Sequence, residues 1–162
     1  FLYAGTPMAT LERLVTQFAA DFDFHIELKG KAPELAAMVF SIVEERGLSE
    51  RSVVTSFSWE QLEQMRKISD RCRLGWLVHD FDQKTLDRAL ELNLFQLCAP
   101  ARAVTEQLVE RGRTVAKEIR VWGMGGTTAE VRALIQQVVD CGSDGMTINW
   151  PDWLLDYVAE NR

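Results

Sequence analysis

Residues 24–30 read Phe-His-Ile-Glu-Leu-Lys-Gly, and the fold assignment depends on this stretch. The run is too short for a helix and has the composition of a strand within a buried sheet. Side chains alternate along a strand, so His25, Glu27 and Lys29 share one face, opposite the isoleucine and leucine. Three polar side chains on one face of a buried strand are costly unless they bind something. The segment therefore predicts a strand with a functional face.

Further short apolar runs follow this strand at regular intervals. The repeat is about 24 residues, which is the length of one βα unit. Near-continuous apolar strands joined by helices indicate a parallel sheet covered by helices. The additional strands are predicted at 53–57, 74–78, 94–98, 119–122 and 146–149.

Helix signals occupy the intervals between these runs. Capping-box spacings at Ser58–Gln61 and Thr127–Glu130 each precede an apolar periodic segment. Pro33 is placed to begin a helix in its first turn. The remaining helices are predicted to begin near Thr10, Asp82, Val104 and Pro151.

The whole chain, residues 1–162, is predicted to form a single α/β domain, because it has no linker, low-complexity tract or charge run. Two architectures fit about six βα units. A doubly wound sheet would be complete at this length, whereas a (β/α)₈ barrel of about 250 residues would lack roughly two units. The turn at 28–33, Leu-Lys-Gly-Lys-Ala-Pro, is no dinucleotide fingerprint. Unit spacing leaves both architectures open.

Composition excludes several classes of function. The chain of 162 residues has a net charge of −6, which argues against a nucleic-acid binder. No apolar stretch approaches the ~20 residues that span a bilayer. The cysteines at 72, 98 and 141 are widely spaced and indicate buried thiols in a reducing compartment. We therefore expect a cytoplasmic protein.

Four segments resemble, in order, the sequence motifs of the glycerophosphodiester phosphodiesterase family. The helix beginning at Thr10 and the strand 26–29 resemble its Thr-Leu-Glu-Glu helix and Ile-Glu-Leu-Lys strand. Segment 53–57 resembles the next strand, which ends in Ser-Phe. Val121-Trp122 stands where the family has Val-Trp-Thr-Val-Asn, and residues 142–151 resemble its closing Gly-Val-Asp-Gly-Ile-Ile-Thr-Asp-x-Pro.

The resemblance implies a TIM-type barrel of which only the C-terminal two thirds, with about six parallel strands, are present. The family's His-Arg-Gly strand, Glu-Asn-Thr loop, Glu-x-Asp strand and following His-Asp have no counterpart here. In the family these segments supply the acid/base histidines and most metal ligands. The opening residue, Phe1 instead of methionine, agrees with the expectation of a partial barrel.

The resemblance also implies a candidate site. Glu27 is expected to ligate Mg²⁺ or Ca²⁺, Lys29 to face a substrate phosphate, and Phe57 and Trp122 to pack against the glycerol or an apolar group. The alternatives are a Glu27 paired with Lys29 or His25, an exposed loop lysine, and two aromatic side chains in the core. Catalytic histidines of the family's type are not identified in this chain.

Other residues favour structural roles. His25 is expected to be a satisfied core histidine. His79-Asp80 follows the Glu27 strand instead of preceding it, so the family role does not transfer, and His79 is expected to be a loop or capping residue. The loop 123–128 could bind an anion but is more typical of a flexible turn. Asn149 replaces the family's aspartate and loses its charge.

Three functional hypotheses follow. The first is metal-dependent hydrolysis of a small glycerophosphodiester to an alcohol and glycerol 3-phosphate, with this chain alone inactive. The second is a non-catalytic binding or assembly module, for instance a homo-oligomer that covers exposed sheet edges. The third is a complete doubly wound domain that binds a small anion at 123–128.

Overall fold

The computed structural model describes residues 8–161, and strands alternate with helices throughout them. The strands are β1 (Phe24–Glu27), β2 (Ser52–Ser56), β3 (Arg73–Leu77), β4 (Gln96–Pro100), β5 (Glu118–Met124) and β6 (Gly145–Ile148). The helices are α1 (Leu11–Phe18), α2 (Leu35–Glu45), α3 (Trp59–Ile68), α4 (Gln83–Glu91), α5 (Glu106–Gly112), α6 (Thr128–Asp140) and α7 (Pro151–Glu160), with short 3-10 turns at Ser49–Arg51 and Ala101–Ala103.

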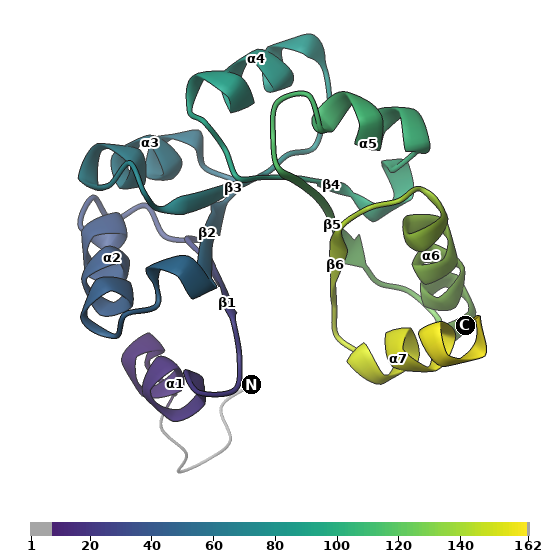
Figure 1. Ribbon diagram of the computed structural model, residues 1–162, viewed down its shortest axis with the longest axis horizontal. Helices are drawn as coiled ribbons and strands as arrows, with labels where there is room; N and C mark the ends of the chain where they lie inside the picture. The colour runs from purple at the N-terminus through teal and green to yellow at the C-terminus, as the bar shows by residue number, and fades with distance from the viewer. Residues whose placement is uncertain (1–7, 162) are drawn as a thin grey trace.

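Within residues 8–161 the strands form one sheet in the order β1-β2-β3-β4-β5-β6, and every neighbouring pair is parallel. A doubly wound sheet reverses its strand order, so that hypothesis is wrong. The sheet curves into a ring that is open on one side, with the helices outside it (Figure 1). This is a TIM-type barrel with six of the usual eight strands, as predicted.

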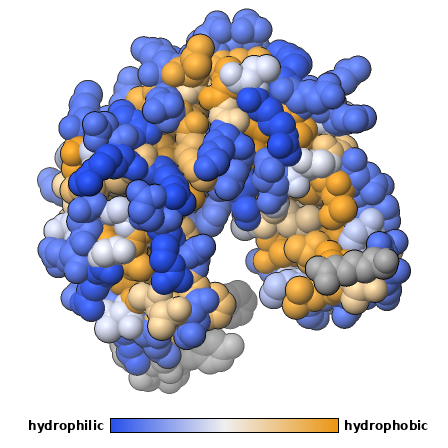
Figure 2. Space-filling view, in the orientation of Figure 1, coloured by the Kyte–Doolittle hydropathy of each residue, from blue (hydrophilic) through white to orange (hydrophobic). Residues whose placement is uncertain are grey.

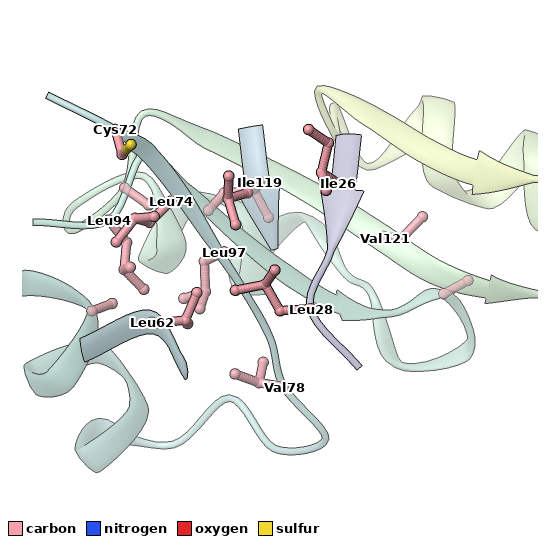
Figure 3. Packing of buried hydrophobic residues seen from close by; sticks show 14 of the residues in the cluster. Ile26, Leu28, Leu62, Cys72, Leu74, Val78, Leu94, Leu97, Ile119 and Val121 are labelled. Atoms are coloured by element: carbon pink, nitrogen blue, oxygen red, sulfur yellow. The ribbon is translucent and has the colours of Figure 1, made fainter. Parts of the chain in front are cut away.

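The hydrophobic core fills the space between the outer face of the sheet and the helices. Leu62 of α3 belongs to one hydrophobic cluster with Leu74 of β3, Leu97 of β4 and Ile119 of β5, and all four side chains are fully buried (Figure 3). Burying side chains of this size stabilises a fold by about 1.5–3 kcal/mol each. The core therefore holds the central strands in register and fixes where their carboxyl ends point.

Local capping signals set the start of most helices. Thr10, Asp82 and Thr127 cap α1, α4 and α6 as the sequence predicts. Thr127 and Glu130 form the complete capping box, in which each side chain accepts a hydrogen bond from the other residue's backbone. A cap of this kind satisfies N–H groups that a helix leaves unpaired at its first turn.

Two of the predicted helix starts differ from the structure. Ser58 caps α3 through the Gln61 backbone N–H, but the Gln61 side chain donates to the Ala32 carbonyl at 3.3 Å, so the predicted reciprocal box is absent there. Pro33 lies in the turn before Glu34, the N-cap of α2, and not in the first helical turn. At Gln61 a contact with the preceding βα unit thus replaces the local signal.

The two ends of the ring are less buried than its centre. Among the described residues, β1 and β6 each pair with one neighbour only. Helix α1 buries Val15 alone, and no α7 residue is fully buried. Figure 2 shows a notch between the two ends of the ring, with hydrophobic residues exposed on the lobe that α6 and α7 form. None of the helices in residues 8–161 is long and apolar enough to cross a membrane.

Candidate functional site

Glu27 and Lys29 lie where β1 ends, at the carboxyl-terminal edge of the sheet. The Lys29 Nζ lies 3.3 Å from the Glu27 Oε2, and the lysine side chain is 77% exposed. The backbone between them is fixed by β2, because the Leu28 N–H donates to the Thr55 carbonyl and the Ser56 hydroxyl donates to the Leu28 carbonyl. An ion pair this exposed stabilises the fold little. Both groups are therefore available to a ligand.

A cavity of about 660 Å³ opens beside this pair. Its charged lining consists of Glu27, Lys29, Lys31 and Glu60, and Phe57 forms an apolar part of its wall. Its volume is in the range typical of small-molecule sites. The structure thus gathers three of the four predicted site residues around one cavity.

Phe57, His79 and Trp122 form a contiguous group, here called the aromatic cluster, at the carboxyl ends of β2, β3 and β5. The Phe57 and His79 rings stack with 5.2 Å between centroids. Trp122 meets both rings edge-on, at 5.0 Å from Phe57 and 5.3 Å from His79. Phe57 is 40% exposed and Trp122 is half-buried, so the cluster forms part of the rim and not of the core.

The orientation of Trp122 is set by its own strand and by β3. Its indole N–H donates to the Val78 carbonyl at 3.1 Å. The next residue, Gly123, has a φ of +80°, and the pairing of β5 with β6 is irregular between Val121 and Met124. Because glycine adopts this left-handed conformation without strain, the strand can bulge directly after the indole. The strand thus bends directly after Trp122, and the hydrogen bond to Val78 holds the indole against the other two rings.

Glu27 fits a divalent cation as one ligand. Carboxylate oxygens are the groups that Mg²⁺ and Ca²⁺ prefer. Across the described part of the chain, no three His, Cys, Asp or Glu side chains are grouped so as to hold a metal ion. Since these ions take about six or more oxygen ligands, Glu27 alone supplies only a fragment of such a site.

The loop 123–128 is held by hydrogen bonds to side chains of the protein itself. The Glu130 carboxylate accepts hydrogen bonds from the Thr127 N–H at 2.8 Å and from its hydroxyl at 2.9 Å. A carboxylate of the protein thus already occupies the start of α6, where an anion would otherwise bind. The Arg102 guanidinium adds a hydrogen bond to the Gly125 carbonyl. These contacts favour the interpretation as a structural turn.

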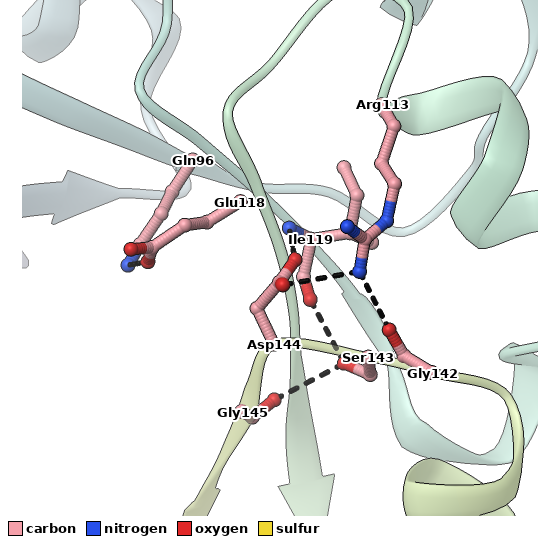
Figure 4. Close-up of polar contacts among 8 residues, drawn as sticks. All are labelled: Gln96, Arg113, Glu118, Ile119, Gly142, Ser143, Asp144 and Gly145. Carbon is pink, nitrogen blue, oxygen red and sulfur yellow. Dashed lines mark hydrogen bonds and ion pairs between the residues drawn. The ribbon is translucent and has the colours of Figure 1, made fainter.

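Asp144, within the segment that resembles the family's closing motif, lies at the opposite end of the sheet. Its carboxylate accepts from the Ile119 N–H at 2.8 Å and from the Arg113 guanidinium at 3.0 Å (Figure 4). The neighbouring Ser143 hydroxyl donates to the Ile119 carbonyl. This network attaches the start of β6 to β5 and is structural. Asn149, after β6, is exposed.

His25 faces the barrel interior at the amino-terminal end of the strands, beside a cavity of about 290 Å³ that Arg73, Glu118 and Arg120 also line. Partial desolvation of its ring beside this cavity, followed by the positive charge of Arg120, lowers the pKa of His25. The residue itself stays exposed, because no described strand covers this side of β1. The expectation of a satisfied core histidine is therefore wrong.

Several solved structures superpose on this chain over most of its length. A protein from Galdieria sulphuraria assigned as a glycerophosphodiester phosphodiesterase superposes with a TM-score of 0.83 at 15% identity, over 96% of this chain and 65% of that one. A glycerophosphodiester phosphodiesterase from Parabacteroides distasonis gives 0.77 at 16% identity, over 93% and 64%. The fold is that of the phosphodiesterase barrels.

A further phosphodiesterase barrel, from Oleispira antarctica, was solved in complex with its product sn-glycerol-3-phosphate. It superposes with a TM-score of 0.78 at 14% identity, over 92% of this chain and 60% of that one. This chain spans 56–67% of the length of such phosphodiesterase barrels. No protein-family model and no curated protein sequence matches it.

Sequence reasoning did not anticipate that His79 contacts Phe57 and Trp122. His79 lies in the β3–α4 loop as expected, but Asp82 and not His79 caps α4. The available signal was its place directly after a strand, two residues beyond the buried Leu77. The position of His79 in the sequence shows that it lies near the carboxyl end of its strand. Its contact with Trp122 depends instead on the order of the strands in the sheet.

Proposed function

We propose that this chain forms the larger part of a barrel that hydrolyses glycerophosphodiesters, adding water across the phosphodiester to give an alcohol and glycerol 3-phosphate. One observation carries the proposal: Glu27, Lys29 and Phe57 line a single cavity at the carboxyl edge of a phosphodiesterase barrel. Active sites of such barrels are built at this edge. A neighbour with this fold holds glycerol 3-phosphate.

Each residue has a distinct role in this proposal. Glu27 would contribute one ligand to Mg²⁺ or Ca²⁺, and the bound ion would offset charge that develops on the phosphoryl group. Lys29 turns from Glu27 toward a phosphate oxygen and acts as a compact positive charge. The exposed face of Phe57 and the edge of Trp122 pack against the carbon atoms of the glycerol.

Acid/base catalysis is the part that this chain lacks under the proposal. The cavity is lined by carboxylates, ammonium groups and amides, and neither histidine of the sequence lines it. A group that titrates near neutral pH is the usual means of moving the proton to the leaving alcohol. We expect the 162-residue chain to bind substrate and product without turning over the substrate.

Calorimetric titration of the chain with sn-glycerol 3-phosphate, with and without Mg²⁺ or Ca²⁺, tests the metal role. Glu60→Gln is the matched control for Glu27→Gln, because Glu60 lines the same cavity but belongs to α3. The divalent ion should tighten binding by the parent and by E60Q, and should have no effect on E27Q. Equal responses of E27Q and E60Q would contradict a metal at the β1 edge.

The phosphate role is tested with a second matched pair. Lys29→Met should weaken binding about threefold to tenfold, because a charge-assisted hydrogen bond is lost at an exposed site. Lys31→Met removes the same charge from the same cavity without touching the Glu27 pair. Similar losses of affinity in K29M and K31M would indicate that the positive charges attract the anion generally. This result would contradict a specific role of Lys29.

A binding or assembly module is the second candidate, favoured by the exposed edges of β1 and β6. Unpaired edge strands invite pairing with another chain. Light scattering coupled to size-exclusion chromatography separates the two candidates. A concentration-independent dimer supports assembly through these edges, and a monomer that binds glycerol 3-phosphate supports the hydrolase part.

A further inference from the structure

His79 is the one member of the aromatic cluster that keeps hydrogen-bonding groups free. Phe57 has none, and the single N–H of Trp122 is committed to the Val78 carbonyl at 3.1 Å. Neither ring nitrogen of His79 meets a hydrogen-bond partner among residues 8–161. Any polar recognition by this cluster must therefore come from the imidazole.

The imidazole is also held in a defined place. Phe57 covers one of its faces and Trp122 contacts it edge-on. The backbone before it is fixed because the Val78 N–H donates to the Cys98 carbonyl at 3.0 Å. The backbone after it is held by the Thr85 hydroxyl, which donates to the Asp80 carbonyl at 3.2 Å. A side chain restrained from both sides loses little conformational entropy when it binds a ligand.

The cluster borders the phosphate-facing part of the site through Phe57, which lines the Glu27–Lys29 cavity with one part of its surface and stacks on His79 with another. His79 lines a neighbouring cavity of about 280 Å³, and Phe57 lines both cavities. A ligand whose phosphate meets Lys29 and whose carbon chain packs on Phe57 would therefore be directed past this ring toward the imidazole. The atoms that would meet His79 are those two or three bonds beyond the phosphate ester oxygen. In glycerol phosphate these atoms carry hydroxyl groups.

We propose that His79 is a specificity residue that hydrogen-bonds the hydroxyl groups of the glycerol moiety, so that the site selects phosphate esters of polyols over those of simple alkyl alcohols. The inference rests on the proposed function and explains how the site would distinguish its substrate from other phosphate esters. The apolar rings contact the carbon atoms, and the imidazole donates to or accepts from a hydroxyl. No proton is transferred to the reacting bond by this residue.

Comparison of two ligands tests the inference. n-Propyl phosphate has the charge and chain length of sn-glycerol 3-phosphate but lacks both hydroxyl groups. We expect the parent chain with Mg²⁺ to bind glycerol 3-phosphate about threefold to tenfold more tightly, as one or two exposed hydrogen bonds allow. His79→Phe keeps an aromatic ring in the stack and should abolish this preference while leaving propyl phosphate affinity unchanged. His25→Phe is the matched control and should retain the preference.

Proton–carbon correlation spectra give a second readout that does not depend on a variant. The sequence has only two histidines, so their imidazole signals are readily assigned. Glycerol 3-phosphate should shift the His79 signals and leave those of His25 in place, and propyl phosphate should shift His79 less.

The outcomes separate this inference from the function on which it rests. Two results would overturn the role of His79 alone. One is Glu27-dependent binding of both ligands by the parent chain with equal affinity, and the other is a preference for glycerol 3-phosphate that survives in H79F. Equal weakening of both ligands in H79F would show a packing role and also overturn it. Absence of binding by either ligand would overturn both proposals.

Discussion

The strands at the centre of the sheet and those at its two edges are buried to very different degrees. All five residues of β2 are buried, as are the first four of β4. By contrast, β1 has one buried residue and β6 has none. The difference arises from neighbours, since each central strand pairs on both sides and each edge strand on one.

This contrast shows which part of the site is preformed. The aromatic cluster stands on β2, β3 and β5, whose positions the core fixes. Glu27 ends β1, at the edge, and Lys29 follows it. The backbone between them is held by β2, where the Thr55 carbonyl accepts a hydrogen bond and the Ser56 hydroxyl donates one. We therefore expect the rim to be rigid at the aromatic cluster and more mobile at Glu27 and Lys29, which under the proposed function would meet the metal and the phosphate.

The largest expected effect is on stability, and it compares a leucine at the centre of the sheet with a leucine at one end of the ring. Leu97 is fully buried in β4, whereas Leu154 of α7 is only partly buried. Leu97→Ala should lower the free energy of unfolding by about 3 kcal/mol, through lost burial and the cavity left behind. Leu154→Ala should cost about 1 kcal/mol.

Urea unfolding followed by circular dichroism measures both variants on one scale. Equal losses would mean that α7 is as well packed as the centre, and the contrast between the regions would then fail.

A smaller effect is expected from two glycines that face the barrel interior. A Cβ at Gly75 in β3 would lie 2.9 Å from Thr55 Cγ2 and 3.1 Å from Gln96 Cβ, atoms held by the neighbouring strands. A Cβ at Gly145 in β6 would instead meet the Arg120 guanidinium, the far end of a flexible side chain. Gly75→Ala should cost about 1–3 kcal/mol by overpacking, and Gly145→Ala clearly less.

The same urea titrations decide this pair. A loss for G145A that matches or exceeds that for G75A would show that the edge is as tightly packed as the centre.

The smallest effect concerns the pH dependence of the β1 edge. Because the pKa of His25 is lower in the fold than its usual 6.5, the unfolded chain takes up this proton first on acidification. The contribution of His25 to stability is thus complete well above pH 6.5 and is lost as pH falls through that value.

Unfolding midpoints at pH 7.5 and pH 5.5 measure this effect. The parent should lose more stability than His25→Asn between the two values. Equal losses would show that the environment of His25 does not lower its pKa.

Much of the fold is predictable from the sequence because its signals are local. Caps such as Thr10 and Asp82 act within one helical turn, and the apolar runs mark each strand to within about two residues. Strand order is not local, and unit spacing alone could not separate a doubly wound sheet from a barrel. The correct choice rested on the resemblance of the strand that carries Glu27.

The candidate site was predictable to a lesser degree for the same reason. The resemblance, together with their places at strand ends, pointed to Glu27, Lys29 and Phe57 as candidates, and all three line one cavity. The contacts of His79 depend on how β2, β3 and β5 bring three rings together in space. The spacing of these residues in the sequence does not predict such contacts. The error at His25 is physical as well. Strand alternation directs the side chain to the barrel interior, but no strand among residues 8–161 lies on that side of β1 to cover it.

Phosphorus NMR of glycerophosphocholine mixed with the 162-residue chain and Mg²⁺ reports binding and hydrolysis in the same spectra. If the rim binds the phosphodiester but lacks the acid/base groups, the phosphodiester resonance should broaden and shift, and the phosphomonoester resonance of glycerol 3-phosphate should not appear. A resonance that stays unperturbed would contradict a binding site at the Glu27 edge. A growing phosphomonoester signal would show that these strands suffice for catalysis and would contradict the need for a missing part.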